Sequence, residues 1–323
     1  MKAIEVRQFG GPEVLHLREA EIGQPGPGQA RVRVMAAGVN FVDIYHRRGS
    51  FPRQLPFTPG LEGAGVVEAV GEGVNHVQPG TRVAYTGQPG AYAEASLVQD
   101  GSLIPLPEGL SWEEAASFPL QGMTAHYLIH EFRTLKPGVV ALIHAAAGGM
   151  GLLLVQWAHH LGARVIGTVS TEEKARAARE AGADEVILYT QKDFVTETKR
   201  LTGGRGADLI IDGVGKTTFA GNLEAAALRG HIVIYGMASG PADPIGPNSL
   251  MGKSLSVSGG SLGNYIANRE DLLRRAQDVL EGMRAGWLKL RLDKVLPLAQ
   301  AAEAHELLEG RKVIGKVVLR TGA

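Results

Sequence analysis

The residues best suited to chemistry form the run His144-Ala145-Ala146-Ala147-Gly148-Gly149-Met150-Gly151. An apolar strand-like segment, 139–143, precedes it and a helical pattern, 152–161, follows it. Small residues between a buried strand and a helix let a diphosphate approach the backbone, and the helix N-terminus offers free N–H groups to the anion. Ala146 stands where G-x-G-x-x-G has its first glycine, so a tight helix–sheet contact without a ligand stays the alternative. We expect a dinucleotide to bind here, at Ala147, Gly148, Gly149, Met150 and Gly151.

The segments after this run alternate between strand-like and helical patterns. The expected strands are 164–169, 185–189, 207–212, 231–236 and 254–257, and the expected helices are 171–181, 194–201 and 218–228. Strands separated by helices form right-handed crossovers, which produce a parallel sheet covered on both faces. The sequence therefore predicts an α/β protein with a doubly wound, Rossmann-type cofactor domain.

The second expected strand indicates which nicotinamide cofactor binds. NAD enzymes carry an Asp or Glu about 20 residues beyond the glycine turn, but here the strand ends Thr168-Val169-Ser170 without a carboxylate. Lys174 lies one helical turn after Ser170, and a hydroxyl with an ammonium suits a 2′-phosphate. Alternatively, Ser170 caps the helix and Lys174 is solvated. Gly236, which ends a later expected strand, is assigned to the cofactor as well.

The residues on either side of this region have a different sequence pattern. Short strand candidates with Gly/Pro turns between them occupy 13–17, 29–35, 63–70, 81–85 and 92–98, and the tail has helical patterns at 271–286 and 298–308 with a strand at 313–320. Short strands with dense turns favour a barrel-like β domain. Ser111 and Glu114 form a capping box at the start of a crossing segment, 110–128. We expect a catalytic domain of residues 1–116 and 263–323 and a cofactor domain of residues 117–262.

Composition excludes several kinds of protein. The 323 residues carry 33 basic and 33 acidic side chains, which provides no basic field for nucleic acid or anionic lipid. No cysteine is present, so disulfides, thiolate catalysis and cysteine-ligated zinc are ruled out. The longest apolar runs are too short to span a membrane, and the start has no signal-peptide core. A cytoplasmic protein without nucleic-acid or membrane partners is expected.

Four segments carry a resemblance to a known family. They are 40–49 (NFVDIYHRRG), 59–65 (PGLEGAG), 121–125 (QGMTA) and 146–151 (AAGGMG), with Gln156 beyond the last. With them the chain resembles, essentially end to end, the zinc-free quinone oxidoreductase (zeta-crystallin-like) branch of the medium-chain dehydrogenase/reductase superfamily. Val139, His159 and Met237 depart from the residues usual in this branch.

The resemblance implies a GroES-like catalytic domain, a cofactor in the cleft between the domains, and no metal. Zinc-dependent relatives bind their metal through a cysteine and a Gly-His-Glu motif, where this chain has Asn40 and Gly60-Leu61-Glu62. Leu61 cannot ligate zinc. The positions of Lys174, Tyr189 and Arg311 line the 2′-phosphate pocket in this branch, which favours NADPH.

The implied reaction is hydride transfer from NADPH to a quinone. Asn40 would stabilise the reacting end of the acceptor, Tyr45 would hydrogen-bond its carbonyl or supply a proton, and Thr124 would orient the nicotinamide. Tyr45 could instead be a wall residue only. Asp43 and Arg47, spaced i,i+4, are expected to form an ion pair along a helix. His46, His144 and His305 are interpreted as surface or packing residues rather than metal ligands.

Two other functions stay open. The first is an NADPH-dependent reductase of activated alkenes such as 2-alkenals or enoyl thioesters, which needs a proton donor near the substrate α-carbon. The second is a non-catalytic NADPH-binding protein. We also expect a homodimer that pairs the outer strand of the cofactor sheet near Ser254–Val257, because an apolar edge strand invites pairing.

Overall fold

The computed structural model describes residues 1–322, and the chain forms two compact units. Unit 1 comprises Met1–Gly122, Ile266–Gln277 and the chain from Leu292 on; unit 2 comprises Met123–Tyr265 and Asp278–Arg291. The chain thus leaves unit 1 a few residues after the expected border at 116 and returns close to the expected border at 263. The prediction differs at 278–291, which it placed in the catalytic domain and which lies with unit 2.

Unit 1 is built around one long strand, β3 (Gln29–Val39). One edge of β3 pairs with β4; the other pairs first with β6 and then with β15, so one strand organises most of the sheet. Its alternating burial places Ala30, Val32 and Val34 in the core while Arg31 and Arg33 face Glu68. The other strands are β1 (Lys2–Glu5), β2 (His16–Glu19), β4 (Glu62–Val70), β5 (Arg82–Thr86), β6 (Ala95–Gln99), β7 (Leu103–Pro105), β14 (Leu292–Pro297) and β15 (Lys316–Arg320).

Short helices accompany this sheet. They are α1 (Phe41–Arg48), α2 (Trp112–Ala115) and α10 (Ala301–Glu309). The capping box at Ser111 and Glu114 is confirmed, with hydrogen bonds in both directions. The helix it starts is only one turn long, and α3 (Pro119–His130) starts anew at a proline, a residue suited to the first turn because it has no N–H to leave unpaired.

Unit 2 contains a six-stranded parallel sheet with the order β10-β9-β8-β11-β12-β13. In chain order this is 3-2-1-4-5-6, the order of a doubly wound dinucleotide fold, so the predicted fold class is confirmed. The strands are β8 (Val140–Ile143), β9 (Arg164–Val169), β10 (Glu185–Leu188), β11 (Ala207–Asp212), β12 (Ala226–Ile234) and β13 (Ser256–Gly259).

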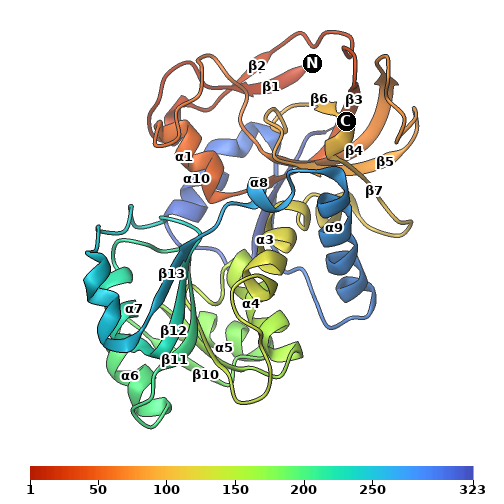
Figure 1. Cartoon of the computed structure of the whole chain (residues 1–323). Coiled ribbons are helices and arrows are strands. Elements are labelled where there is room, and N and C mark those ends of the chain that lie inside the picture. The colour runs from red at the N-terminus through yellow and green to blue at the C-terminus, as the bar shows by residue number, and fades with distance from the viewer. Residues whose placement is uncertain (323) are drawn as a thin grey trace. The chain divides into compact units, whose positions relative to one another are not determined.

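Helices cover both faces of this sheet. Figure 1 shows α4 (Gly149–His160) and α5 (Glu172–Glu180) on one face, with α6 (Phe194–Leu201) and α7 (Phe219–Ala225) on the other. The remaining helices are α8 (Leu262–Tyr265) and α9 (Arg269–Arg284). The strand order reverses between β8 and β11, and the carboxyl ends of these strands are where such folds bind their ligands.

Some expectations about local structure need correction. The helix expected at 218–228 ends at Ala225, and the strand expected at 231–236 begins already at Ala226. The strand expected at 13–17 is a 3-10 turn, Pro12–Val14, followed by β2, because proline fixes a turn-like φ there. The edge strand β14 (Leu292–Pro297), which pairs in parallel with β15, was not predicted. No helix among residues 1–322 is both long and apolar enough to cross a membrane.

Candidate active site

The loop after β8 brings the backbone of the glycine run against the start of α4. A Cβ added to Gly151 would lie 2.2 Å from the Ala145 carbonyl oxygen, so only glycine fits there. Ala145 itself has a φ of 51°, in the left-handed region. Ala146, which replaces the first motif glycine, is buried, and a Cβ on Gly167 of β9 would lie 2.8 Å from its methyl carbon. The glycine missing from the motif is therefore compensated by a glycine on the neighbouring strand.

The N-terminus of α4 has no side-chain cap. Gly148 occupies the N-cap position, and no side-chain hydrogen bond satisfies the first N–H groups of the helix. Gly148, Gly149 and Met150 are partly exposed, whereas Ala147 is buried. An uncapped, accessible helix start of this length provides donors and a positive dipole end for an anion.

A buried polar network ties together the carboxyl ends of β8, β9 and β11. His144 hydrogen-bonds the Thr168 hydroxyl at 2.9 Å and Oδ1 of Asn222 at 2.7 Å. Asn222 Nδ2 donates in turn to Asp212 at 2.6 Å. The other Asp212 oxygen accepts the backbone N–H of Val214 at 2.6 Å, which holds the loop that follows β11.

The partners settle the protonation of His144. An amide oxygen can only accept, so Nε2 of His144 carries the proton and Nδ1 accepts from Thr168. Burial lowers the pKa of His144, consistent with this neutral form. The interpretation of His144 as a packing residue is confirmed, but the sequence did not show that it braces the edge of the sheet next to the glycine loop.

The residues proposed for the 2′-phosphate in unit 2 lie at or shortly after the carboxyl ends of β9 and β10. Tyr189 N–H donates to the Val169 carbonyl at 3.1 Å, and the Thr190 hydroxyl donates to the Ser170 carbonyl at 3.0 Å. Tyr189 is 40% exposed. Lys174 lies in the first turn of α5, whose N-cap is Thr171. The alternative that Ser170 merely caps the helix is therefore wrong.

The other assigned residues lie as follows. Gly236 follows the carboxyl end of β12, on the same edge of the sheet as the glycine loop. Thr124 is buried within α3, in unit 2. Arg311 belongs to unit 1, where it is exposed just after α10 with a left-handed φ of 54°. The roles of these three residues stay predictions.

Unit 1 contains a buried, charged cluster around Asn40. The Lys316 ammonium donates to Glu62 Oε2 at 2.5 Å and to Asn40 Oδ1 at 2.8 Å. Asn40 Nδ2 donates to the same Glu62 oxygen at 2.9 Å and to the Gly38 carbonyl at 3.3 Å. The second Glu62 oxygen accepts the Leu120 N–H at 2.7 Å. Each carboxylate oxygen thus has a partner, which is what a buried charge requires.

This cluster changes the interpretation of Asn40. Its oxygen also accepts from Gln121 Nε2 at 3.1 Å, so both ends of the amide are engaged, and the side chain is 3% exposed. Asn40 holds its neighbours in place and has no spare donor for an acceptor oxygen. Lys316 was not singled out from the sequence, although a lysine directly before the apolar run Val317-Val318-Leu319 was a signal that could have found it.

Aromatic side chains follow Asn40 along α1. The Tyr45 ring lies 5.4 Å from Phe51 in an edge-to-face arrangement and 6.3 Å from Phe41. Phe51 is 47% exposed, and Tyr45 is partly exposed. The wall function considered for Tyr45 has support from these contacts, and Phe51 is an addition to the predicted site. Together the three rings form a partly exposed aromatic cluster.

The ion pair expected between Asp43 and Arg47 does not form. Both side chains are fully buried, but Asp43 accepts hydrogen bonds from Asn40 N–H at 2.9 Å and from the Tyr92 hydroxyl at 3.1 Å. Arg47 instead pairs with Glu309 at 2.7 Å. Tertiary partners on other elements have replaced the helical i,i+4 contact.

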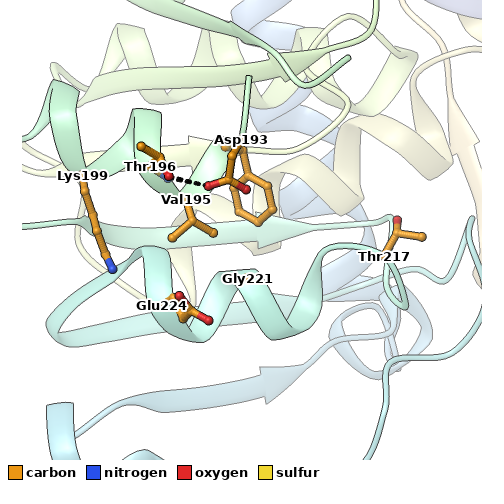
Figure 2. A pocket seen from close by; sticks show the side chains of 8 residues that line it. Asp193, Val195, Thr196, Lys199, Thr217, Gly221 and Glu224 are labelled. Atoms are coloured by element: carbon orange, nitrogen blue, oxygen red, sulfur yellow. Dashed lines mark hydrogen bonds between the residues drawn. The ribbon is translucent and has the colours of Figure 1, made fainter. Parts of the chain in front are cut away.

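Two further features bear on ligands. A hollow of about 490 Å³ lies between α6 and α7, and Figure 2 shows Asp193, Lys199, Thr217 and Glu224 around it; none of the predicted site residues lines it. Among residues 1–322, no three His, Asp or Glu side chains gather closely enough to hold a metal ion.

Comparison with known proteins agrees with this architecture. Residues 26–108 match the family described as alcohol dehydrogenase GroES-like domain, and residues 149–278 match the one described as zinc-binding dehydrogenase. The chain is 42% identical to a 2-haloacrylate reductase of a Burkholderia species, with 98% of each protein covered. It is 41% identical to a quinone oxidoreductase of Pseudomonas aeruginosa, with coverage of 98% and 99%.

A solved structure shares the whole fold. The quinone oxidoreductase of Escherichia coli complexed with NADPH superimposes with a TM-score of 0.97 at 38% identity, over 99% of this chain and 100% of that one. A GroES-like domain joined to a doubly wound cofactor domain defines a medium-chain dehydrogenase/reductase. Within that superfamily, this chain belongs to the zinc-free quinone oxidoreductase branch.

Proposed function

We propose that the protein is an NADPH-dependent, metal-independent quinone reductase. The observation that carries this proposal is the Lys316–Glu62–Asn40 cluster. Its own ammonium occupies the carboxylate and the amide at the position where zinc-dependent relatives carry their metal-binding motif. Oxidising an alcohol requires a metal or a free base to take the hydroxyl proton. Glu62, Lys316 and Asn40 instead hydrogen-bond one another. A quinone accepts a hydride without that help.

The carboxyl edge of the unit 2 sheet, where the loop after β8 lies, suits a dinucleotide. Gly151 leaves no room for a side chain between the loop and the helix, and the uncapped start of α4 supplies N–H donors. Ala147, Gly148, Gly149, Met150, Gly151 and Gly236 would hold the diphosphate and its neighbours, while Ser170, Lys174, Tyr189 and Arg311 would select the 2′-phosphate. Bound NADPH supplies the hydride, as in the two NADPH-complexed relatives, from E. coli and a mycobacterium.

The residues of unit 1 would bind the acceptor. The exposed ring of Phe51 and the edge-to-face Tyr45 suit a flat, electron-poor quinone. The Tyr45 hydroxyl would hydrogen-bond the developing oxyanion. Asn40 would act by holding Lys316 and Gln121 in place rather than by contacting the acceptor. Thr124 would orient the nicotinamide.

A second function has a specific observation in its favour. The relative at 42% identity is a 2-haloacrylate reductase, which acts on an activated alkene. That reaction requires a proton at the α-carbon as well as a hydride, and Tyr45 would be its donor. The alkene reductase predicted from the sequence as an alternative therefore remains the competing proposal.

The test is an acceptor screen. The purified protein is assayed with and without prior chelator treatment. In one assay it receives NADPH and a quinone, a 2-alkenal or 2-haloacrylate; in the other it receives NADP⁺ and a primary alcohol. We expect rapid NADPH oxidation with quinones that chelators do not change. Turnover only with the alkenes would favour the alternative, and failure with every acceptor would leave the non-catalytic NADPH-binding protein.

We propose in addition that the protein is a homodimer. β13 is an edge strand, hydrogen-bonded on one side only to β12 within the described chain, and it overlaps the segment Ser254–Val257 expected to pair. Pairing of β13 with its copy would cover that edge. Sedimentation at micromolar concentration tests this, and a monomer would contradict it. The cytoplasmic location and the lack of nucleic-acid partners stay predictions.

A further inference from the structure

A chain of four buried, hydrogen-bonded side chains runs from Arg47 in the last turn of α1, through His305 on α10, to Asp43 in the first turn of α1. Arg47 Nη1 lies 3.1 Å from His305 Nδ1, His305 Nε2 lies 3.1 Å from the Tyr92 hydroxyl, and that hydroxyl lies 3.1 Å from Asp43 Oδ2. All four residues are at most 1% exposed. Their sequence separation, from Asp43 to His305, means that the fold alone assembles them.

The direction of every hydrogen bond in this chain is fixed by Arg47. A guanidinium can only donate, so His305 Nδ1 must accept and its proton must lie on Nε2. His305 then donates to the Tyr92 oxygen, and Tyr92 donates its own proton to Asp43. The pKa of His305 is lowered to about 3 by burial and by Arg47, in agreement with a neutral ring.

This arrangement cannot carry protons in from solvent. The outer end of the chain is Arg47, which pairs with Glu309 and does not release a proton. What the chain delivers is a hydrogen bond to one oxygen of Asp43. The same oxygen accepts the backbone N–H of Asn40, while Oδ1 has no partner within the described residues.

The charged and titratable groups that face Asp43 come from several elements. They are Tyr92, Lys316 on β15, Glu62 on β4, and, through the chain, Arg47 on α1 and His305 on α10. Burial raises the pKa of Asp43 to about 7, although the Asn40 N–H, Lys316 and Tyr92 oppose that rise. Oδ1 can take up a proton without displacing either donor from Oδ2. The carboxyl can therefore change charge while the chain stays intact.

We propose that Asp43 is a positioning residue that changes its charge with pH. Its ionised carboxylate accepts the Asn40 N–H and so fixes the first turn of α1, the helix that bears Tyr45. Tyr92, His305 and Arg47 are its supports. The effect on turnover rests on the proposed function, whereas the effect on the Asn40 amide does not. Deprotonation strengthens the hydrogen bond from the Asn40 N–H, because an ionised acceptor binds more strongly than a neutral one.

The experiment measures two quantities in the same pH series, from 5 to 9. One is the NMR chemical shift of the Asn40 amide; the other is kcat/KM for a quinone at saturating NADPH. In the wild type both are expected to change with a shared inflection near pH 7. Asp43→Asn should abolish that inflection in both quantities. Tyr92→Phe, which removes a donor to the carboxylate, should move the inflection to higher pH.

Arg48→Gln is the matched control, since Arg48 pairs with the same Glu309 but is exposed and takes no part in the hydrogen bonds from Arg47 to Asp43. It should keep the wild-type inflection. If Asp43→Asn does not fold, Tyr92→Phe decides alone. An Asn40 amide that does not titrate near pH 7, or an inflection unmoved by Tyr92→Phe, would overturn the proposal. Absence of any quinone turnover would sink the proposed function instead, and the amide titration would still decide the role of Asp43.

Discussion

Lys316 donates a hydrogen bond of 2.5 Å to Glu62, although 254 positions separate the two residues in the chain. Both side chains are at most 3% exposed. The pair joins β15, near the end of the chain, to β4, and Asn40 bridges it. A buried charge is stable only when it is paired with an opposite charge, so loss of one partner leaves the other uncompensated.

Lys316→Met is expected to lower the free energy of unfolding by about 3–5 kcal/mol, because it leaves a carboxylate buried without its counter-ion. The double variant Glu62→Gln/Lys316→Met should recover much of that loss. Urea denaturation of the wild type, both single variants and the double variant measures the coupling. Strictly additive losses would show that the two charges do not depend on each other.

Gly151→Ala is expected to destabilise unit 2 by about 1–3 kcal/mol, because the new methyl group meets the Ala145 carbonyl oxygen and the loop has to move. NADPH affinity should fall with it. Gly148→Ala is the matched variant for stability, since a Cβ there lies 3.4 Å from the same oxygen. Thermal unfolding of the two variants without cofactor compares them, and equal stability would contradict the close approach seen here.

Lys174→Ala is expected to weaken NADPH binding ten- to a hundredfold, or about 1.5–3 kcal/mol, while NADH binding barely changes. The reason is loss of a charge-assisted contact to the 2′-phosphate. Arg176→Ala, an exposed residue of the same helix, is the control and should change neither affinity. Calorimetric titration with both cofactors gives the answer; an equal loss for NADPH and NADH would make Lys174 structural.

Tyr45→Phe is expected to slow quinone reduction by a factor of about ten or less, because water can replace the hydroxyl as the donor to the oxyanion. Reduction of a 2-alkenal should fall further, since carbon protonation requires a placed acid. Steady-state rates with both acceptors at saturating NADPH separate the two functions. If alkene reduction were unaffected, Tyr45 would not be the proton donor for that reaction.

Acid is expected to destabilise the protein through two buried histidines. Burial lowers the pKa of His46 to about 4 and that of His305 to about 3. Below about pH 6.5 the unfolded chain therefore binds more protons at these two rings than the folded protein does. The stability that these rings contribute is fully present above about pH 6.5 and is lost as the pH falls towards 4 and 3.

His305→Gln keeps a neutral hydrogen-bonding side chain but cannot titrate. Denaturant unfolding of this variant and the wild type at a series of pH values should show a shallower loss of stability in the variant between pH 6.5 and 4. A variant curve parallel to that of the wild type would mean that His305 is already protonated in the folded protein.

The doubly wound fold was predictable because each of its signals is local. Buried apolar runs such as 164–169 and 207–212 became strands with those same bounds, and the helix after Ser170 ends before Gly182 as expected. Turn geometry, helix caps and apolar periodicity act over a few residues, so the sequence alone determines them. The lack of cysteine and the presence of Leu61 are likewise properties of the sequence itself, and they suffice to exclude the usual zinc ligands.

Only the tertiary structure decided which polar groups meet. Asp43 and Arg47 have the spacing of a helical ion pair, yet each found a better partner on a distant element, Tyr92 and Glu309 respectively. Asn40 was expected to face the acceptor, and its amide is instead consumed by Glu62, Lys316 and Gln121. A buried polar group takes whichever partner the packed strands bring within about 3 Å, and that choice depends on distances between segments that no local pattern encodes.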